Sequence, residues 1–374
     1  MRVSARSGRV PMSSQTARAA RGVGSAAPGV EAAVVAYLRR ARVDAAAAHE
    51  HLLGTGAVGE LEDRLRRHYG KRHALVVANA TSALLAVAIA LDLGEGEVVA
   101  PPLAWGGSIA GFLHVGARLL FGDVDPLTLT LCPAAAQEAL SSRVRALLAV
   151  DLFGVPADDE ALRSLADEKG LWYIHDAAQS LGATREGRPA GALAHVVVTS
   201  FTAGKTLFAG EGGAVLTDDD NLYARLVWLT QHPHRHKREL GLRLANEFAL
   251  NLRIHPVAAV WANEDFSAAL RRLGARQRRA NAIRRKVEAS GLVQPLSFAE
   301  RELQPSYFRL TCAWADRPDA GRLEELLGPV RDAPRVRSLA IEPLYAQVPS
   351  TLVAGHPCCK NAEEQLQRRF EIAL

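Results

Sequence analysis

The stretch SFTAGKTLFAGEGGAV, residues 200–215, places one lysine, Lys205, among small, apolar and hydroxyl side chains and closes with a Gly-Glu-Gly-Gly turn. The apolar run at 195–201 leads into this stretch as a buried strand would. The chain has six lysines against thirty-nine arginines, so arginine is its ordinary basic residue. The presence of a lysine rather than an arginine just past a predicted buried strand therefore requires an explanation.

The body of the chain is electrically balanced. Residues 1–30 hold five arginines and no acid, which accounts for the net charge of +5. A basic groove for nucleic acid is therefore not expected, and no apolar run is long enough to span a bilayer. Residues 1–29 are expected to form a disordered Arg-rich tail, with an organellar transit peptide as the alternative. Four cysteines without zinc spacing favour a cytoplasmic protein with no metal site.

Short apolar runs alternate with helical segments through the first two thirds of the chain. The predicted strands are 73–79, 97–105, 117–125, 144–154, 171–180 and 195–201, and the predicted helices are 29–44, 59–70, 81–94 and 159–170. This alternation is typical of parallel strands covered on both faces. From about residue 216 the pattern is helical, and shorter elements follow. We expect an α/β fold with a large domain at 30–255 and a small α+β domain at 256–374.

Three polar features stand where predicted strands end, which is where open parallel sheets bind ligands. Residues 79–82 join a strand to a helix, so backbone N–H groups and the hydroxyls of Thr81 and Ser82 could hold a phosphate. Asp176 ends a second strand and Lys205 follows a third. A phosphate cradle, a carboxylate for a pyridine nitrogen and an amine for an aldehyde are together what pyridoxal phosphate requires.

Each of these features also has an ordinary explanation. A strand-end aspartate is commonly a helix N-cap, and the NATSA segment is a common strand-to-helix junction. A lysine at a strand end commonly extends its aliphatic stem and reaches solvent. Periodicity does not show that the three features converge in space.

Several motifs carry a resemblance to a known family. HDAAQSLGA (175–183), SFTAGKTLFAGEGGAVLT (200–217) and FALNLRIHPVAAV (248–260) resemble those of the DegT/StrS-type aminotransferases, and the likeness covers roughly residues 30–290. Members of that family are pyridoxal-phosphate enzymes of the aspartate-aminotransferase fold (fold type I) that act on keto-sugars and keto-cyclitols. The spacing of S-F-x-x-x-K, G-E-G-G and D-A-A-Q is specific to it.

The resemblance implies roles around the cofactor ring. Lys205 becomes the Schiff-base lysine and general acid/base, and Asp176 the partner of the pyridine nitrogen. Gln179 becomes the hydrogen-bond donor to the ring hydroxyl. Trp105 matches the aromatic residue that stacks on the ring, although a core position beside the proline pair at 101–102 is the alternative.

The resemblance also implies how the phosphate is held. Thr81, Ser82 and Ser200 would bind it within one subunit. Asn251 matches the residue that reaches the phosphate from the neighbouring subunit, so a homodimer with a shared active site is expected. Without the family, Asn251 would pass for a turn residue.

The chain departs from the family at four places. Ala80 replaces a usual glycine, so the phosphate loop must avoid positive φ there or accept strain. His175 stands where the family is often acidic, beside Asp176. The His- and Arg-rich segment 230–240 is expected to be a solvated loop, with contact to an anionic substrate as the alternative. The sequence ends at RRFEIAL, where relatives usually continue through a closing helix.

The resulting hypothesis is an aminotransferase that moves an amino group from glutamate or glutamine to a keto-sugar or keto-cyclitol in aminoglycoside-like natural-product biosynthesis. One alternative is a family enzyme with another outcome, although family dehydratases typically replace the lysine with histidine. The other is a cofactor-binding regulator without turnover. No Arg-Lys cluster clearly demands a diphosphate, which favours a non-nucleotide substrate slightly.

Overall fold

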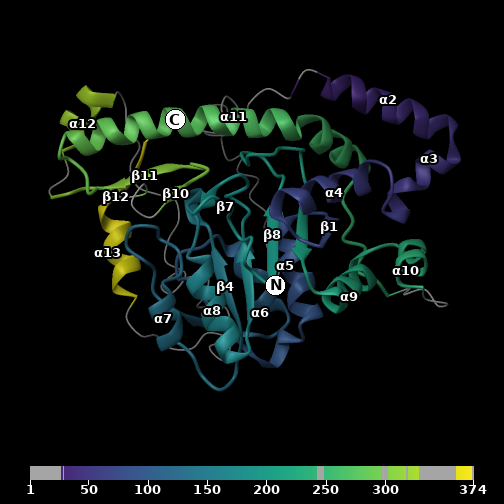
Figure 1. Cartoon of the computed structure of the whole chain (residues 1–374), viewed down its shortest axis with the longest axis horizontal. Coiled ribbons are helices and arrows are strands. Elements are labelled where there is room, and N and C mark those ends of the chain that lie inside the picture. Colours follow the sequence, from purple (N-terminus) through teal and green to yellow (C-terminus); the bar gives the residue numbers. More distant parts are fainter. Residues whose placement is uncertain are drawn as a thin grey trace, which may run out of the picture.

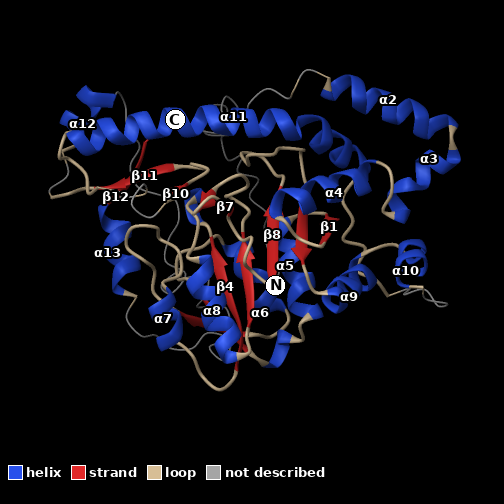
Figure 2. Ribbon diagram, viewed as in Figure 1, coloured by secondary structure: helices blue, strands red, loops and turns tan. Residues whose placement is uncertain are grey.

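The computed structural model describes residues 27, 29–241, 248–295, 298, 302–316, 319–327 and 359–372, so nearly all of the predicted tail lies outside it. The centre is a seven-stranded sheet with helices on both faces (Figure 1; Figure 2). In spatial order its strands are β1 (His73–Val77), β9 (Gly213–Thr217), β8 (Val196–Ser200), β5 (Trp172–Asp176), β4 (Val144–Val150), β2 (Glu97–Ala100) and β3 (Arg118–Phe121).

The sheet is mostly parallel, which confirms the predicted α/β class. Strands β8, β5, β4, β2 and β3 pair in parallel, whereas β9 runs antiparallel to both β8 and β1. The glycine-rich turn after Lys205 produces this reversal, because it returns the chain beside β8 with Gly213 opposite Ser200. A Cβ on Gly213 would lie 2.7 Å from the backbone nitrogen of Ala80, so only glycine allows β9 to pass there.

Two apolar layers sandwich the sheet. One contains α5 (Ala80–Ala90), α6 (Gly106–His114) and α9 (Asp220–Thr230). The other contains α4 (Ala57–Tyr69), α8 (Asp159–Lys169) and the first half of α11 (Pro256–Ala289). Ile174 belongs to the first layer and Tyr173 to the second, because successive residues of a strand face opposite sides.

The long helix α11 runs from the sheet towards a smaller C-terminal unit (Figure 1). Its far end packs through Ala280 and Val287 into a third core with β11 (Leu310–Ala313) and β12 (Arg369–Ile372). The predicted division of the chain at residues 255 and 256 stays a prediction.

The remaining elements complete the described chain. They are α2 (Val30–Val43), α3 (Ala45–His49), η2 (Glu50–Leu53), η3 (Leu93–Glu95), α7 (Pro133–Glu138), η4 (Leu152–Gly154), β6 (Thr184–Arg185), β7 (Arg188–Pro189), α10 (Pro233–Leu240), β10 (Leu303–Gln304), α12 (Ala320–Leu327) and α13 (Lys360–Arg368). Among the described helices, none combines the length and the apolar character needed to cross a membrane.

Residues 233–240 correct one expectation, because they form helix α10 rather than a solvated loop. Arg235 is 1% exposed and donates from its two terminal nitrogens to the two carboxylate oxygens of Glu62, at 3.0 Å each. The buried partner stands on α4, 173 positions away along the chain. The basic composition of the segment predicted exposure to solvent. The ion pair between Arg235 and Glu62 instead holds the segment against the core.

Candidate active site

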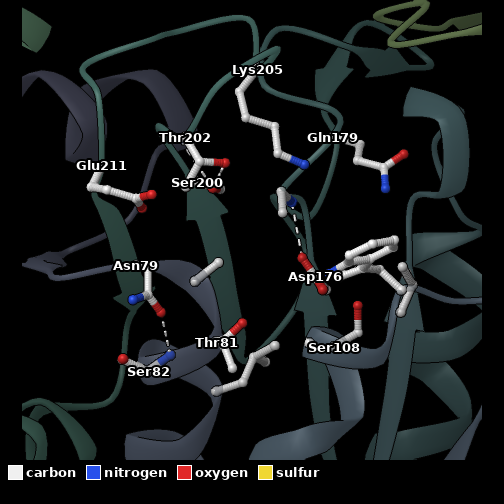
Figure 3. A pocket seen from close by; sticks show the side chains of 16 residues that line it. Asn79, Thr81, Ser82, Ser108, Asp176, Gln179, Ser200, Thr202, Lys205 and Glu211 are labelled. Carbon is white, nitrogen blue, oxygen red and sulfur yellow. Dashed lines mark hydrogen bonds between the residues drawn. The ribbon is translucent and has the colours of Figure 1, made fainter. Parts of the chain in front are cut away.

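A pocket of about 430 Å³ opens beyond the carboxyl ends of the parallel strands (Figure 3). It is lined by Asn79, Ala80, Thr81, Ser82, Leu84, Trp105, Gly107, Ser108, Val150, Asp176, Ala178, Gln179, Ser200, Thr202, Lys205 and Glu211. Of the eight residues predicted for the site, seven line this pocket, and Asn251 does not. The fold therefore brings together residues on or just after the ends of β5 and β8 and at the start of α5, a convergence that periodicity alone could not show.

The N-terminus of α5 forms one wall of the pocket. Asn79 caps this helix in an extended conformation, and its side-chain oxygen accepts the backbone N–H of Ser82 at 2.8 Å. Ala80 begins the helix and takes no positive φ, so the alanine at this position adds no strain. A Cβ on Gly107 would lie 2.7 Å from the Thr81 hydroxyl. The backbone N–H groups at the start of α5 and the hydroxyls of Thr81 and Ser82 thus line the pocket together, an arrangement suited to binding a phosphate.

Asp176 lies buried at the end of β5 on the floor of the pocket. One carboxylate oxygen accepts the backbone N–H of Ala178 at 3.0 Å, and Ser108 donates a second hydrogen bond. Burial raises the pKa of Asp176 above its usual value, while these hydrogen bonds and the nearby Lys205 oppose the rise. Such a carboxylate gains by pairing with a buried cation.

Lys205 enters the same pocket from the turn after β8 (Figure 3). Its amine lies 4.6 Å from the centre of the Phe308 ring. Burial lowers the pKa of Lys205, Asp176 counteracts this, and Arg309 lowers the pKa further. A lysine with a lowered pKa more readily supplies the neutral amine that attacks an aldehyde.

Gln179 faces the pocket from the segment after β5. Its side-chain oxygen accepts the backbone N–H of Phe153 at 2.8 Å. This bond fixes the orientation of the amide and leaves its NH₂ group as the donor towards the pocket. Ser200 stands at the end of β8, with its hydroxyl 3.3 Å from that of Thr202.

Trp105 is 66% exposed at the start of α6, so it is not the core residue that was one alternative. Its side chain lines the pocket beside Gly107 and forms an open apolar wall. An exposed indole at a pocket mouth provides a flat face on which an aromatic ring can stack.

Asn251 stands outside the pocket of its own chain and is exposed, at a φ of 52°. Arg253 donates a hydrogen bond to its side-chain oxygen. The surrounding segment is anchored to the sheet, because Ala78 donates to the Leu252 carbonyl at 2.8 Å. Asn251 is therefore exposed on the surface of its own chain, with its side-chain oxygen bonded to Arg253.

Sequence reasoning missed several residues of the site. The predicted junction at 79–82 already contained Asn79, and the structure adds its role as the N-cap of α5. Ser108, Thr202 and Glu211 carry no periodic signal that places them in a pocket. Phe308 reaches Lys205 from the C-terminal unit, and only the tertiary fold shows that contact.

The fold and the pocket define a class of protein. A mostly parallel sheet with a strand-end lysine, a buried strand-end aspartate and a helix N-terminus in one pocket is the arrangement of a fold-type-I enzyme, and these residues fit pyridoxal phosphate. Residues 37–372 match the DegT/DnrJ/EryC1/StrS aminotransferase family. The chain belongs to that family, whose cofactor is pyridoxal phosphate.

Known relatives agree with this assignment. The chain is 36% identical over 185 residues to a UDP-2-acetamido-2-deoxy-3-oxo-D-glucuronate aminotransferase of Pseudomonas aeruginosa, covering 49% of this chain and 51% of the relative. It is 41% identical over 161 residues to an L-glutamine:2-deoxy-scyllo-inosose aminotransferase of Streptomyces paromomycinus, covering 43% and 38%. The matched regions thus span about half or less of these relatives.

A solved structure shares the fold. The crystal structure of 3-amino-5-hydroxybenzoic acid synthase superimposes with a TM-score of 0.77 at 22% identity, covering 92% of this chain and 90% of that one. This likeness extends from the N-terminal helices into the C-terminal unit and supports the fold assignment.

Proposed function

We propose that the protein is a pyridoxal-phosphate-dependent aminotransferase that transfers an amino group from glutamate or glutamine to a keto-sugar or keto-cyclitol. The observation that carries the proposal is the meeting of Lys205, Asp176 and the α5 N-terminus in one pocket. The two relatives named above act on a keto-sugar and on a keto-cyclitol, which supports the same substrate class here. We place the reaction in cytoplasmic natural-product biosynthesis of the aminoglycoside type.

Each pocket residue has a proposed task. Lys205 would hold the cofactor covalently and, once displaced by substrate, move a proton at the reacting carbon. Asp176 would keep the ring nitrogen protonated, and Gln179 would donate to the ring hydroxyl. When bound, the cofactor supplies an electron sink for the electrons released at the substrate carbon.

The remaining residues would bind and orient the cofactor. Thr81, Ser82 and Ser200 would hold the phosphate at the α5 N-terminus, and Trp105 would cover one face of the ring. We further propose a homodimer in which Asn251 reaches the partner's phosphate site. The exposed position of Asn251 outside its own pocket supports that arrangement.

The half-reaction with an amino donor tests the activity. We expect the cofactor-loaded protein, mixed with glutamate or glutamine alone, to release up to one equivalent of 2-oxo acid per subunit as the cofactor converts to its amine form. Lys205→Arg should release none, whereas Lys237→Arg, at an exposed lysine of α10, should match the wild type. Cofactor binding without release would contradict transamination and favour the regulator.

The acceptor is identified by a second step. Protein carrying the amine form is offered a panel of keto-sugars, nucleotide-linked keto-sugars and keto-inositols. Regeneration of the original absorption by one class, with the matching aminated product, identifies the substrate. If only simple 2-oxo acids regenerate it, the proposed substrate class is wrong.

A further inference from the structure

A buried ion triad lies behind the pocket, on the opposite side of β5 from Asp176. The His175 ring contacts Asp151 through Nε2 at 2.8 Å and Asp159 through Nδ1 at 2.7 Å. His175 and Asp151 are fully buried, and Asp159 nearly so. The hydroxyl of Tyr173 donates to the same Asp159 oxygen at 2.5 Å.

The contacts fix the charge of the imidazole. Burial alone would lower the pKa of His175, but the two carboxylates outweigh burial and raise it well above its usual value. In turn, burial would raise the pKa of Asp159, but the charge of His175 keeps it lowered. An acidic side chain at position 175 would instead face two carboxylates without water. The two aspartates therefore account for a histidine at this position.

Asp151 connects the triad to the turn that follows β4. Its Oδ1 accepts the backbone N–H of Ala157 at 2.8 Å, and its Oδ2 accepts the hydroxyl of Ser180 at 2.5 Å. Its own N–H donates to the carbonyl of Asp176 at 3.1 Å. One carboxylate thus fixes both ends of the turn at 152–157 and the segment that carries Gln179.

The centre of the turn is hydrogen-bonded to the Gln179 side chain and to segment 306–309. The N–H of Phe153, which has a φ of 60°, donates to the Gln179 side chain, and its carbonyl accepts the N–H of Arg309 at 3.2 Å. The carbonyl of Gly154 accepts the N–H of Ser306 at 2.9 Å. A Cβ on Gly154 would lie 2.0 Å from the Ser306 hydroxyl, so the turn and segment 306–309 are closely fitted.

We propose that His175 is a positioning residue, which acts through Asp151 and the 152–157 turn to hold the Gln179 amide at the cofactor ring. This proposal rests on the role given to Gln179 under the proposed function. The same turn is hydrogen-bonded to segment 306–309, which contains the Phe308 ring beside Lys205. The ion triad thus holds the turn that positions both Gln179 and Phe308 at the pocket.

The test uses the full-length protein with pyridoxal phosphate and neither substrate. His175→Gln, Gln179→Ala and the double variant are compared for cofactor affinity and for the absorption maximum and pH midpoint of the bound cofactor's visible band. We expect His175→Gln to shift the band towards that of Gln179→Ala and to weaken cofactor binding by about two- to tenfold, the effect of one displaced hydrogen bond. In the Gln179→Ala background, His175→Gln should shift the absorption band no further and should weaken cofactor binding no further.

Tyr173→Phe is the matched control. It removes the hydroxyl that donates to Asp159 at 2.5 Å and lies 2.9 Å from His175 Nδ1, on the side of the ring away from Asp151. It should lower thermal stability and leave the band and the cofactor affinity unchanged. If Tyr173→Phe and His175→Gln shift the band equally, the triad is only a stabilising element and the proposal is wrong. The proposal is also wrong if the effects of His175→Gln and Gln179→Ala on the band and on cofactor affinity add in the double variant.

Ser180→Ala replaces His175→Gln as the test variant if His175→Gln does not fold. It removes the hydroxyl bound to Asp151 and should shift the band in the same direction by a smaller amount, and an unshifted band would overturn the proposal. These readouts need no amino donor or acceptor, so a failure of transamination leaves them intact. A wild-type chain that bound no cofactor would instead overturn the proposed function.

Discussion

His175 and Asp176 are neighbours on β5, and their side chains face opposite layers of the fold. Asp176 stands in the pocket with Ser108 and Lys205 nearby, whereas His175 is enclosed by two carboxylates. The sequence could identify Asp176 as a strand-end acid and as the first residue of D-A-A-Q. It could not identify the partners of His175, since Asp151 and Asp159 come from separate segments.

The first residue-scale prediction concerns Asp176→Asn. An opposite charge shifts the pKa of its neighbour by about 1–3 units, so the amide should lower the proton-binding constant of the ring nitrogen by about ten- to a thousandfold. We expect the variant to bind cofactor and to lose most of its turnover, measured as 2-oxo acid release from the donor. Normal turnover would exclude the proposed role.

The second residue-scale prediction is a pH dependence of stability. The two carboxylates raise the pKa of folded His175 above its unfolded value near 6.5, although burial opposes them. The stabilisation is therefore complete below about pH 6.5 and declines, by up to about 1.4 kcal/mol per unit, as pH rises towards the folded pKa. Denaturant unfolding should show the wild-type advantage over His175→Gln shrinking as pH rises above about 7. A constant difference would mean that folded His175 is neutral.

At the scale of elements, strands and long helices were predictable because their apolar patterns are local. The runs at 73–79 and 195–201 became β1 and β8, and Gly70 and Gly170 end their helices in the left-handed conformation. The reversal of β9 and the helix at 233–240 were not predictable. Both depend on contacts with distant segments, the close approach to Ala80 and the Glu62 ion pair.

That ion pair gives the prediction at the element scale. Arg235→Met leaves the Glu62 carboxylate buried without its partner and should lower the free energy of unfolding by about 3–5 kcal/mol. Adding Glu62→Leu should restore part of the loss, because it removes the unpaired Glu62 carboxylate but leaves the Val76 N–H without its acceptor. Arg188→Ala, at an exposed pair, is the control and should cost no more than about 1 kcal/mol. A small effect of Arg235→Met would show that α10 is held by other contacts.

At the scale of the whole molecule, the proposed shared site predicts complementation between subunits. A lost hydrogen bond to a charged phosphate costs about 1.5–3 kcal/mol, so Asn251→Ala should fold but bind cofactor weakly. Mixed with Lys205→Ala, it should regain activity at limiting cofactor, because one site of the mixed dimer combines an intact Lys205 with an intact Asn251. Activity no greater than the sum of the two variants, with subunit exchange confirmed, would mean that Asn251 serves its own subunit or none.

The covalent attachment of the cofactor tests the whole account most directly. The chain has six lysines, and only Lys205 lines the described pocket with a buried carboxylate and a helix N-terminus. The purified protein should be yellow, and borohydride should discharge that colour and fix the cofactor to one peptide. We predict that tryptic mapping places the adduct on Lys205; an adduct on any other lysine, or no adduct in a cofactor-loaded protein, would contradict the assignment of the site.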